Sequence, residues 1–157
     1  MPQSGQDILT LREAALQYLN ALLIQGIPYL WGGDDPLAGF DCSGMIHEIH
    51  QAIGLEPHNV DSTAHDLYLK YKIQKTEDPQ PGDLVFWFKD GKAIHVEMIW
   101  ILTTAGPITV GASGGGSKTK TLQDAIKNNA FIKPRPITYR GINYKIVDPF
   151  KEYENAP

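Results

Sequence analysis

Cys42 is the residue of this chain whose type and position point most directly to covalent chemistry. It is the only cysteine, and it lies in the segment Phe40-Asp41-Cys42-Ser43-Gly44, directly before apolar residues at helical spacing up to Ile53. The pattern predicts a helix that begins at Cys42 with Asp41 as its N-cap. At such a position the helix dipole and the unpaired backbone N–H groups stabilise a thiolate, although a lone cysteine is more often a buried packing residue. Cys42 is therefore a candidate nucleophile.

A nucleophilic cysteine needs a histidine nearby as its base, and the chain offers five histidines. Two of them share the expected helix of Cys42 but lie too far along it to face the thiol, and we interpret them as partly solvated. Two others fall near loops or helix starts, where solvent exposure is the simplest interpretation. These four are His47, His50, His58 and His65. The fifth, His95, lies in an expected strand that can face the tip of the cysteine helix, so we expect Cys42 and His95 to form the catalytic pair.

Two other segments look like cofactor motifs but lack the required spacing. The histidines of His47-Glu48-Ile49-His50 are at i and i+3, whereas a zinc-peptidase helix needs i and i+4, and a single cysteine cannot make a multi-cysteine zinc site. The glycine-rich stretch from Gly111 to Lys118 has Ser117 where a phosphate-binding loop needs its lysine. We expect no metal and no other cofactor.

The elements that must position these residues change character along the chain. Apolar periodicity predicts a first helix over Leu9–Leu23, with Thr10 and Glu13 as a capping box, and then the cysteine helix. The later elements are predicted by capping and strand signals. They are a short helix capped by Asp61-Ser62-Thr63 and ending at Tyr71, strands over 84–88 and 93–102 around an Asp90-Gly91 turn, a strand over 108–112, a short helix over 122–130, and one or two strands within 131–147. Helices first and an antiparallel sheet second is the α+β class.

Length, charge and hydropathy narrow the kind of protein. A chain of 157 residues fits a single domain over 1–157, with 149–157 a polar tail. A net charge of -4 without a run of lysines or arginines argues against a nucleic-acid partner. No apolar run approaches the roughly 18 residues of a membrane span, and the N-terminus lacks the pattern of a signal peptide. We expect a protein made in the cytoplasm that has no membrane partner.

Five ordered segments together resemble the NlpC-type cell-wall cysteine peptidase family of the papain-like superfamily. They are Pro28-Tyr29-Leu30-Trp31-Gly32-Gly33, Phe40-Asp41-Cys42-Ser43-Gly44, Asp61-Ser62-Thr63-Ala64, Gln80-Pro81-Gly82-Asp83-Leu84-Val85-Phe86 and Ile94-His95-Val96. Each segment alone is weak, but their ordered combination is specific. The resemblance implies a papain-like fold, with N-terminal helices packed on a central antiparallel β-sheet. It also implies hydrolysis of an amide bond in a peptidoglycan stem peptide through an acyl-enzyme on Cys42.

The same resemblance implies roles in substrate binding for three residues near the cysteine. Tyr29 would support the oxyanion or the substrate, and Asp41 and Ser43 would bind the substrate amine. Each also has a simpler structural explanation, because Tyr29 could only pack in the core, and Asp41 and Ser43 could only cap the helix.

The sequence departs from the family at the third catalytic position. The family usually has a polar residue, often histidine, asparagine or glutamine, on the strand after the histidine strand, where it orients the imidazole. The aligned residue here is Gly111, which has no side chain. Glu97 lies two residues beyond His95 on the same face of its strand and is the candidate for this role. We therefore expect Cys42, His95 and Glu97 as the catalytic residues.

The stretch over 111–119 and the short helix after it are similar to the phage branch of this family, which includes tail-associated wall hydrolases. This similarity implies other phage tail proteins as partners and a place on the virion. The alternative from another class is a structural or wall-binding module of a phage tail with a weak or inactive cysteine site. Fast alkylation of Cys42 would favour the enzyme, and an inert thiol would favour the module.

Overall fold

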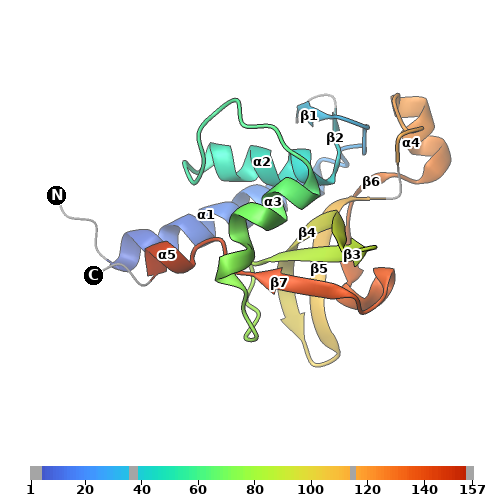
Figure 1. Cartoon of the computed structure of the whole chain (residues 1–157). Helices are drawn as coiled ribbons and strands as arrows, with labels where there is room; N and C mark the ends of the chain where they lie inside the picture. Colours follow the sequence, from blue (N-terminus) through green and yellow to red (C-terminus); the bar gives the residue numbers. More distant parts are fainter. Residues whose placement is uncertain (1–4, 36–38, 114–115, 155–157) are drawn as a thin grey trace.

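The computed structural model describes residues 5–35, 39–113 and 116–154, with most helices in the first half of the chain and most strands in the second (Figure 1). The helical elements are α1 (Gly5–Ile24), α2 (Cys42–Ala52), α3 (Ala64–Tyr71), η1 (Lys72–Gln74), α4 (Leu122–Asn128), η2 (Ile137–Arg140) and α5 (Lys151–Glu154). The strands are β1 (Asp34–Asp35), β2 (Gly39–Phe40), β3 (Leu84–Lys89), β4 (Lys92–Thr103), β5 (Gly106–Ser113), β6 (Phe131–Pro136) and β7 (Tyr144–Val147). The predicted α+β class is confirmed.

Five of the strands form one antiparallel sheet in the order β6-β5-β4-β3-β7. β3 and β4 make the predicted hairpin, and both residues of its turn, Asp90 and Gly91, have positive φ (51° and 77°), as a type I′ turn requires. Pro134 and Pro136 lie in β6, an edge strand, where a missing N–H does not interrupt the central hydrogen bonds. β1 and β2 form a separate short antiparallel pair directly before α2.

Helices α1, α2 and α3 lie together on one side of the sheet, and the main hydrophobic core fills the space between the two layers (Figure 1). Both α2 and α3 contact β4, so the cysteine helix packs against the histidine strand. A smaller cluster covers the opposite face of the sheet and consists of Val85, Trp87, Ile99 and Ile137, flanked by Tyr139, Tyr144 and Ile146. His95 thus lies on a strand that is packed on both faces.

The two ends of the described chain differ from the sequence prediction and pack against each other. α1 begins at Gly5, so Thr10 lies inside the helix and is not its cap. Near the other end Phe150 is fully buried, and Arg12 of α1 donates to Asp148 Oδ1 at 2.9 Å. The Phe150 ring and the buried ion pair of Arg12 with Asp148 therefore hold the chain against the core through residue 150. The sequence predicted a polar tail from residue 149. Residues 155–157 of that expected tail lie outside the described residues.

Among the helices that the structure describes, none combines the length and apolarity needed to span a membrane.

Candidate active site

Cys42 is the first residue of α2, as predicted, and the local sequence explains why the helix begins there. Asp41 is the N-cap, and its Oδ1 accepts hydrogen bonds from Gly44 N at 2.7 Å and from Ser43 Oγ at 3.3 Å. A Cβ at Gly44 would overlap the carbonyl oxygen of Gly33, so only glycine allows the helix tip to lie this close to the preceding loop. Asp41 and the two glycines therefore hold the Cys42 thiol at the edge of the pocket.

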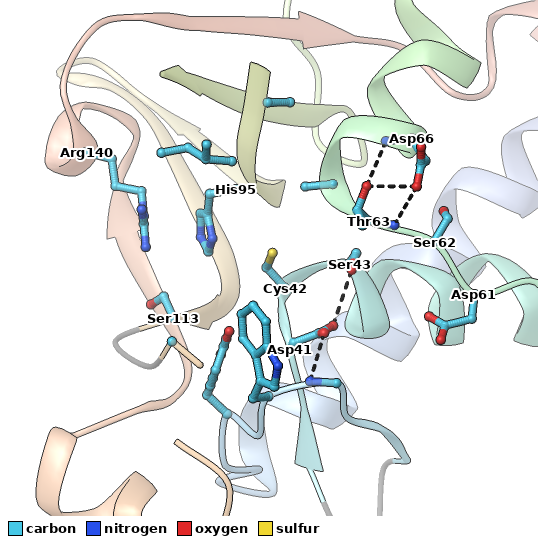
Figure 2. A pocket seen from close by; sticks show the side chains of 17 residues that line it. Asp41, Cys42, Ser43, Asp61, Ser62, Thr63, Asp66, His95, Ser113 and Arg140 are labelled. Carbon is cyan, nitrogen blue, oxygen red and sulfur yellow. Dashed lines mark hydrogen bonds between the residues drawn. The ribbon is translucent and has the colours of Figure 1, made fainter. Parts of the chain in front are cut away.

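His95 of β4 faces the Cys42 thiol from the sheet side (Figure 2). Its Nε2 lies 2.6 Å from Glu97 Oε2, which leaves Nδ1 as the nitrogen available to Cys42. Burial alone would favour the neutral ring. The negative charge of a Cys42 thiolate and its hydrogen bond, followed by the hydrogen bond and charge of Glu97, outweigh burial and raise the pKa of His95 to about 9. The arrangement therefore favours the charged imidazolium form of His95 beside the Glu97 carboxylate.

Glu97 is fully buried behind the His95 ring and is held by two further donors. Thr109 Oγ1 donates to Glu97 Oε1 at 2.7 Å, and the Tyr139 hydroxyl donates to Oε2 at 2.5 Å. Burial pushes the pKa of Glu97 upward, but the hydrogen bond and charge of His95 and the donors Tyr139 and Thr109 hold it below its ordinary value. The raised pKa of His95 and the lowered pKa of Glu97 are consistent with each other. Both indicate a buried ion pair whose carboxylate oxygens are hydrogen-bonded.

Gly111 explains how Glu97 fits into this place. β4 and β5 pair Met98 with Val110, next to Glu97 and Gly111, and a Cβ at position 111 would overlap Glu97 Cγ and lie 2.8 Å from its Cδ. The Glu97 side chain thus fills the space above Gly111. The departure from the family at residue 111 is therefore matched by a carboxylate that arrives at the imidazole from the histidine strand itself.

The paired residues lie in a pocket of about 630 Å³ between the tip of α2 and the sheet (Figure 2). Tyr29, Asp41 and Ser43, to which the resemblance assigned roles in substrate binding, line this pocket together with Cys42 and His95. Glu97 lies behind the imidazole and outside the pocket lining.

Tyr29 reaches the pocket through backbone pairing with the strand that precedes Cys42. Its backbone N–H donates to Ala130, and Leu30 N–H donates to Phe40 O at 2.8 Å, which aligns this segment with β2. Burial, followed by the negative charges of Cys42 and Asp41, raises the pKa of the Tyr29 phenol. The hydroxyl therefore stays protonated and can act as a hydrogen-bond donor in the pocket.

Several residues at the site were not assigned a role from the sequence. Ser113 and Arg140 line the strand side of the pocket, and Trp31 lines its loop side. Thr109 and Tyr139 contact the site only through Glu97. Trp31 lies in the motif segment 28–33, but no local motif marks Thr109, Tyr139 or Arg140, because sheet pairing and the course of the chain after β6 bring them to the site.

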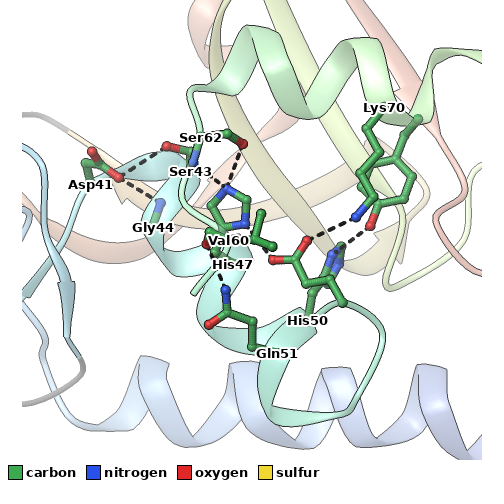
Figure 3. Close-up of polar contacts among 11 residues, drawn as sticks. Asp41, Ser43, Gly44, His47, His50, Gln51, Val60, Ser62 and Lys70 are labelled. Carbon is green, nitrogen blue, oxygen red and sulfur yellow. Dashed lines mark hydrogen bonds and ion pairs between the residues drawn. The ribbon is translucent and has the colours of Figure 1, made fainter. Parts of the chain in front are cut away.

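The prediction that His47 and His50 are partly solvated is wrong, because both side chains are buried (Figure 3). His47 is bonded to the loop after α2, and the His50 ring packs against the rings of Tyr71 and Phe150. His47 Nδ1 donates to Glu56 Oε1 at 2.5 Å, and its Nε2 accepts from Ser62 N at 3.1 Å and lies 2.9 Å from Ser62 Oγ. His50 is packed beside Tyr71, and burial lowers its pKa to about 4. These histidines serve structure, since His47 fixes the loop that brings Ser62 to the rim of the pocket.

With this geometry in place, comparison with known proteins is informative. The model of the NlpC/P60 family matches residues 26–148. The chain is 38% identical over 80 residues to the bifunctional muramidase/DL-endopeptidase CwlT of Bacillus subtilis (strain 168), covering 49% of this chain and 23% of that protein. It is 36% identical over 83 residues to the murein DD-endopeptidase MepH of Escherichia coli (strain K12), covering 50% of this chain and 30% of that protein. The similarity thus spans less than a third of the length of these relatives.

Solved structures support the fold. The chain is similar to the crystal structure of the NlpC/p60 domain of the peptidoglycan hydrolase SagA, with a TM-score of 0.54 and 19% sequence identity, covering 87% of this chain and 97% of that one. The helices followed by a five-stranded antiparallel sheet agree with the papain-like fold of that domain. The family model covers most of the chain, including Cys42, His95 and all five strands of the main sheet. The chain therefore belongs to the NlpC/P60 family.

Proposed function

We propose that this protein is a peptidoglycan hydrolase that cleaves an amide bond of a stem peptide, with Cys42 as nucleophile and His95 as general acid and base. The observation that carries the proposal is that Cys42 and His95 line one pocket while Glu97 is buried behind the imidazole, within hydrogen-bond distance of His95 Nε2. The similarity to enzymes named as peptidoglycan endopeptidases supports the choice of substrate.

The first half of the reaction forms an acyl-enzyme. Cys42 Sγ attacks the carbonyl carbon of the amide, and the carbonyl oxygen takes the negative charge. Backbone N–H groups at the tip of α2, which have no helix carbonyl to accept them, and the neutral Tyr29 hydroxyl would stabilise this oxyanion. His95 then gives its Nδ1 proton to the amide nitrogen, the C–N bond breaks, and the amine leaves.

The second half regenerates the site. His95, now neutral, takes a proton from water, and the resulting hydroxide attacks the thioester carbonyl. Collapse of this intermediate breaks the C–S bond and releases a carboxylic acid, returning Cys42 as thiolate and His95 as imidazolium. Glu97 takes part throughout as a positioning residue, because it fixes the ring by Nε2 and favours its charged form.

The proposal is tested by digesting purified peptidoglycan with the wild type and with Cys42→Ala, and identifying the new termini by mass spectrometry. Release of peptides by the wild type and not by the variant supports the proposal and identifies the bond. Wild-type protein that releases nothing from several wall types, and whose Cys42 reacts with iodoacetamide no faster than a free thiol, refutes it and favours a structural or wall-binding module.

The cellular setting is a separate proposal. The relatives reported above are bacterial proteins, and their names do not refer to phages. Phage tail partners and a location on a virion stay predictions from the sequence, to be checked by mass spectrometry of purified particles from the source.

A further inference from the structure

The Glu97 oxygen that faces His95 accepts a second hydrogen bond. Glu97 Oε2 lies 2.6 Å from His95 Nε2, and the Tyr139 hydroxyl donates to the same oxygen at 2.5 Å. The Tyr139 oxygen also lies 3.3 Å from His95 Nε2, so the three polar atoms form a closed triangle. The other Glu97 oxygen accepts from Thr109 Oγ1. His95 and Tyr139 therefore share one oxygen of a fully buried carboxylate.

The surroundings of Tyr139 hold its hydroxyl as a donor to Glu97. Burial, followed by the charge and the hydrogen bond of Glu97, raises the pKa of Tyr139 to about 12, so the hydroxyl stays protonated. Arg140 Nε donates to the Tyr139 oxygen at 2.9 Å, which leaves the single hydroxyl proton for Glu97. A hydroxyl that accepts from a guanidinium is also a stronger donor, because successive hydrogen bonds polarise one another. The Tyr139 ring packs against Trp87, with 5.8 Å between the ring centres, and this contact fixes its position.

The elements packed against this triangle bring few charges to it within the described part of the chain. A thiol approaches His95 from α2, and two guanidiniums, from η2 and β6, lie 5.6 and 4.8 Å from the centre of the Tyr139 ring. β3 contributes a neutral indole ring and β5 a neutral hydroxyl. In this order the residues are Cys42, Arg140, Arg135, Trp87 and Thr109. Tyr139 carries the influence of Arg140 to the carboxylate through its hydroxyl.

Two donors that share one oxygen weaken each other. The Tyr139 hydrogen bond is strongest when the carboxylate keeps its full negative charge, which is the case when the His95 ring is neutral. When the ring is charged, its Nε2 proton draws on the same oxygen, and the Tyr139 hydrogen bond becomes weaker. Tyr139 thus stabilises the neutral ring more than the charged ring. It opposes the rise in the His95 pKa that Cys42 and Glu97 produce.

We propose that Tyr139, polarised by Arg140, is a positioning residue that limits the hold of Glu97 on the His95 proton. An imidazolium that is held too tightly gives its proton to the leaving amine slowly, and a general acid works best when its pKa lies near the working pH. Glu97 supplies the charge that forms the imidazolium, and Tyr139 keeps this imidazolium able to release its proton. The inference deepens the proposed function, since it rests on His95 as general acid and base.

Tyr139→Phe tests the inference, because it removes the hydroxyl and keeps the ring that packs on Trp87. The titration of His95, followed by NMR of isotope-labelled histidine and assigned with His95→Asn, is expected to move to higher pH by about 0.5–1 unit. The shift is no larger because only the difference between the two ring states counts. The alkaline limb of peptidoglycan cleavage moves in the same direction, and kcat at neutral pH falls about 3- to 10-fold. Arg140→Gln gives a smaller shift of the same sign.

The sign of the shift separates this role from mechanical support. If Tyr139 only held Glu97 in place, Tyr139→Phe would loosen the carboxylate and move the titration of His95 to lower pH, as expected for Glu97→Gln. That result, or an unmoved titration, overturns the inference. In the Glu97→Gln background, Tyr139→Phe is expected to move the titration by less than about 0.3 unit, because its effect passes through the carboxylate. A full upward shift in the double variant would also refute the inference.

Tyr144→Phe is the matched control for the loss of the hydroxyl. Tyr144 also packs edge-on against Trp87, with 6.3 Å between the ring centres, whereas the hydrogen bonds to Glu97 come from His95, Thr109 and Tyr139. Tyr144→Phe is expected to keep the wild-type titration of His95 and the wild-type pH profile. A shift equal to that of Tyr139→Phe would assign the effect to packing on Trp87 and overturn the role of the hydroxyl.

The NMR titration needs neither substrate nor turnover, so it separates this inference from the proposed function. An upward shift in Tyr139→Phe, together with a wild type that releases nothing from peptidoglycan, retains the effect of Tyr139 on His95 and refutes the hydrolase. Cleavage by the wild type, together with an unmoved titration in Tyr139→Phe, retains the hydrolase and refutes the inference.

Discussion

Replacing Glu97 by glutamine removes the carboxylate that faces His95 Nε2 and keeps the length and shape of the side chain. The two side chains are almost fully buried, 4% and 0% exposed, and their atoms lie 2.6 Å apart, so solvent screens their interaction little. A glutamine oxygen can still accept from Nε2, so the variant loses the charge and keeps a neutral hydrogen bond. The substitution thus isolates the electrostatic part of the contact.

The expected effect follows from the protonation of His95. The rise in its pKa from the ordinary 6.5 to about 9 corresponds to about 3 kcal/mol of added stability for the imidazolium, to which Cys42 and Glu97 both contribute against burial. A hydrogen bond to a charged group typically contributes about 1.5–3 kcal/mol, so Glu97→Gln is expected to lower kcat roughly 10- to 100-fold.

The pH dependence has a definite direction. A raised folded-state pKa means that the imidazolium is fully formed below pH 6.5 and is lost as the pH rises through about 9. Without the Glu97 charge, the alkaline limb of the activity profile is expected to move to lower pH by about one pH unit. Glu97→Gln is not expected to shift the acidic limb of the activity profile to higher pH.

Two assays check this prediction, and one does not need the substrate. Release of amine from peptidoglycan gives kcat against pH, and alkylation by iodoacetamide reports Cys42 alone because the chain has one cysteine. Glu77→Gln is the matched control, since Glu77 is 90% exposed and makes only a surface ion pair with Lys75. The reasoning is refuted if Glu97→Gln, folded like the control, keeps both the wild-type rate and the wild-type alkaline limb.

Three further substitutions test other parts of the structure. Gly111→Ala places a methyl group against the Glu97 side chain, so it is expected to lower the free energy of unfolding by about 1–3 kcal/mol. It is also expected to slow cleavage at least as much as Glu97→Gln. Full activity would contradict the proposed link between Gly111 and Glu97. Arg12→Ala leaves two buried carboxylates unpaired, one of them Asp83, and is expected to cost about 3–5 kcal/mol in urea unfolding. Because burial raises the Asp83 pKa to about 6 despite Arg12, this loss should shrink as the pH falls below that value, and a constant loss would argue against it. His47→Phe keeps a buried ring but removes its hydrogen bonds to Glu56 and Ser62. We expect it to lower the free energy of unfolding by at least about 2 kcal/mol and to raise KM. An unchanged KM would exclude a link between His47 and the pocket.

The positions of Cys42 and His95 on their elements were predictable from the sequence because their signals are local. The cap, the cysteine and the following apolar spacing lie within a dozen residues, and each part depends on backbone geometry that neighbouring residues impose. The histidine strand was predictable for the same reason, since two β-rich runs around Asp90-Gly91 define a hairpin. Fold class followed from the order of these elements along the chain.

The burial of His47 and His50 was not predictable by the same reasoning. A polar residue on a helix is usually solvated, and no local pattern shows that the loop after α2 binds His47 or that Tyr71 and Phe150 pack against His50. The sequence prediction therefore failed where a distant segment changed the environment of a helix face.

Local sequence thus determined where Cys42 and His95 lie on their own elements, and tertiary structure decided what surrounds them. The space that Gly111 leaves for Glu97 depends on the pairing register of two strands, and a shift of one residue would turn these groups to opposite faces. Arg140 and Ser113 both line the pocket although they lie 27 residues apart in the sequence, because the chain returns to the site after the edge strand β6. Such contacts depend on the three-dimensional path of the backbone, which short-range sequence patterns do not predict.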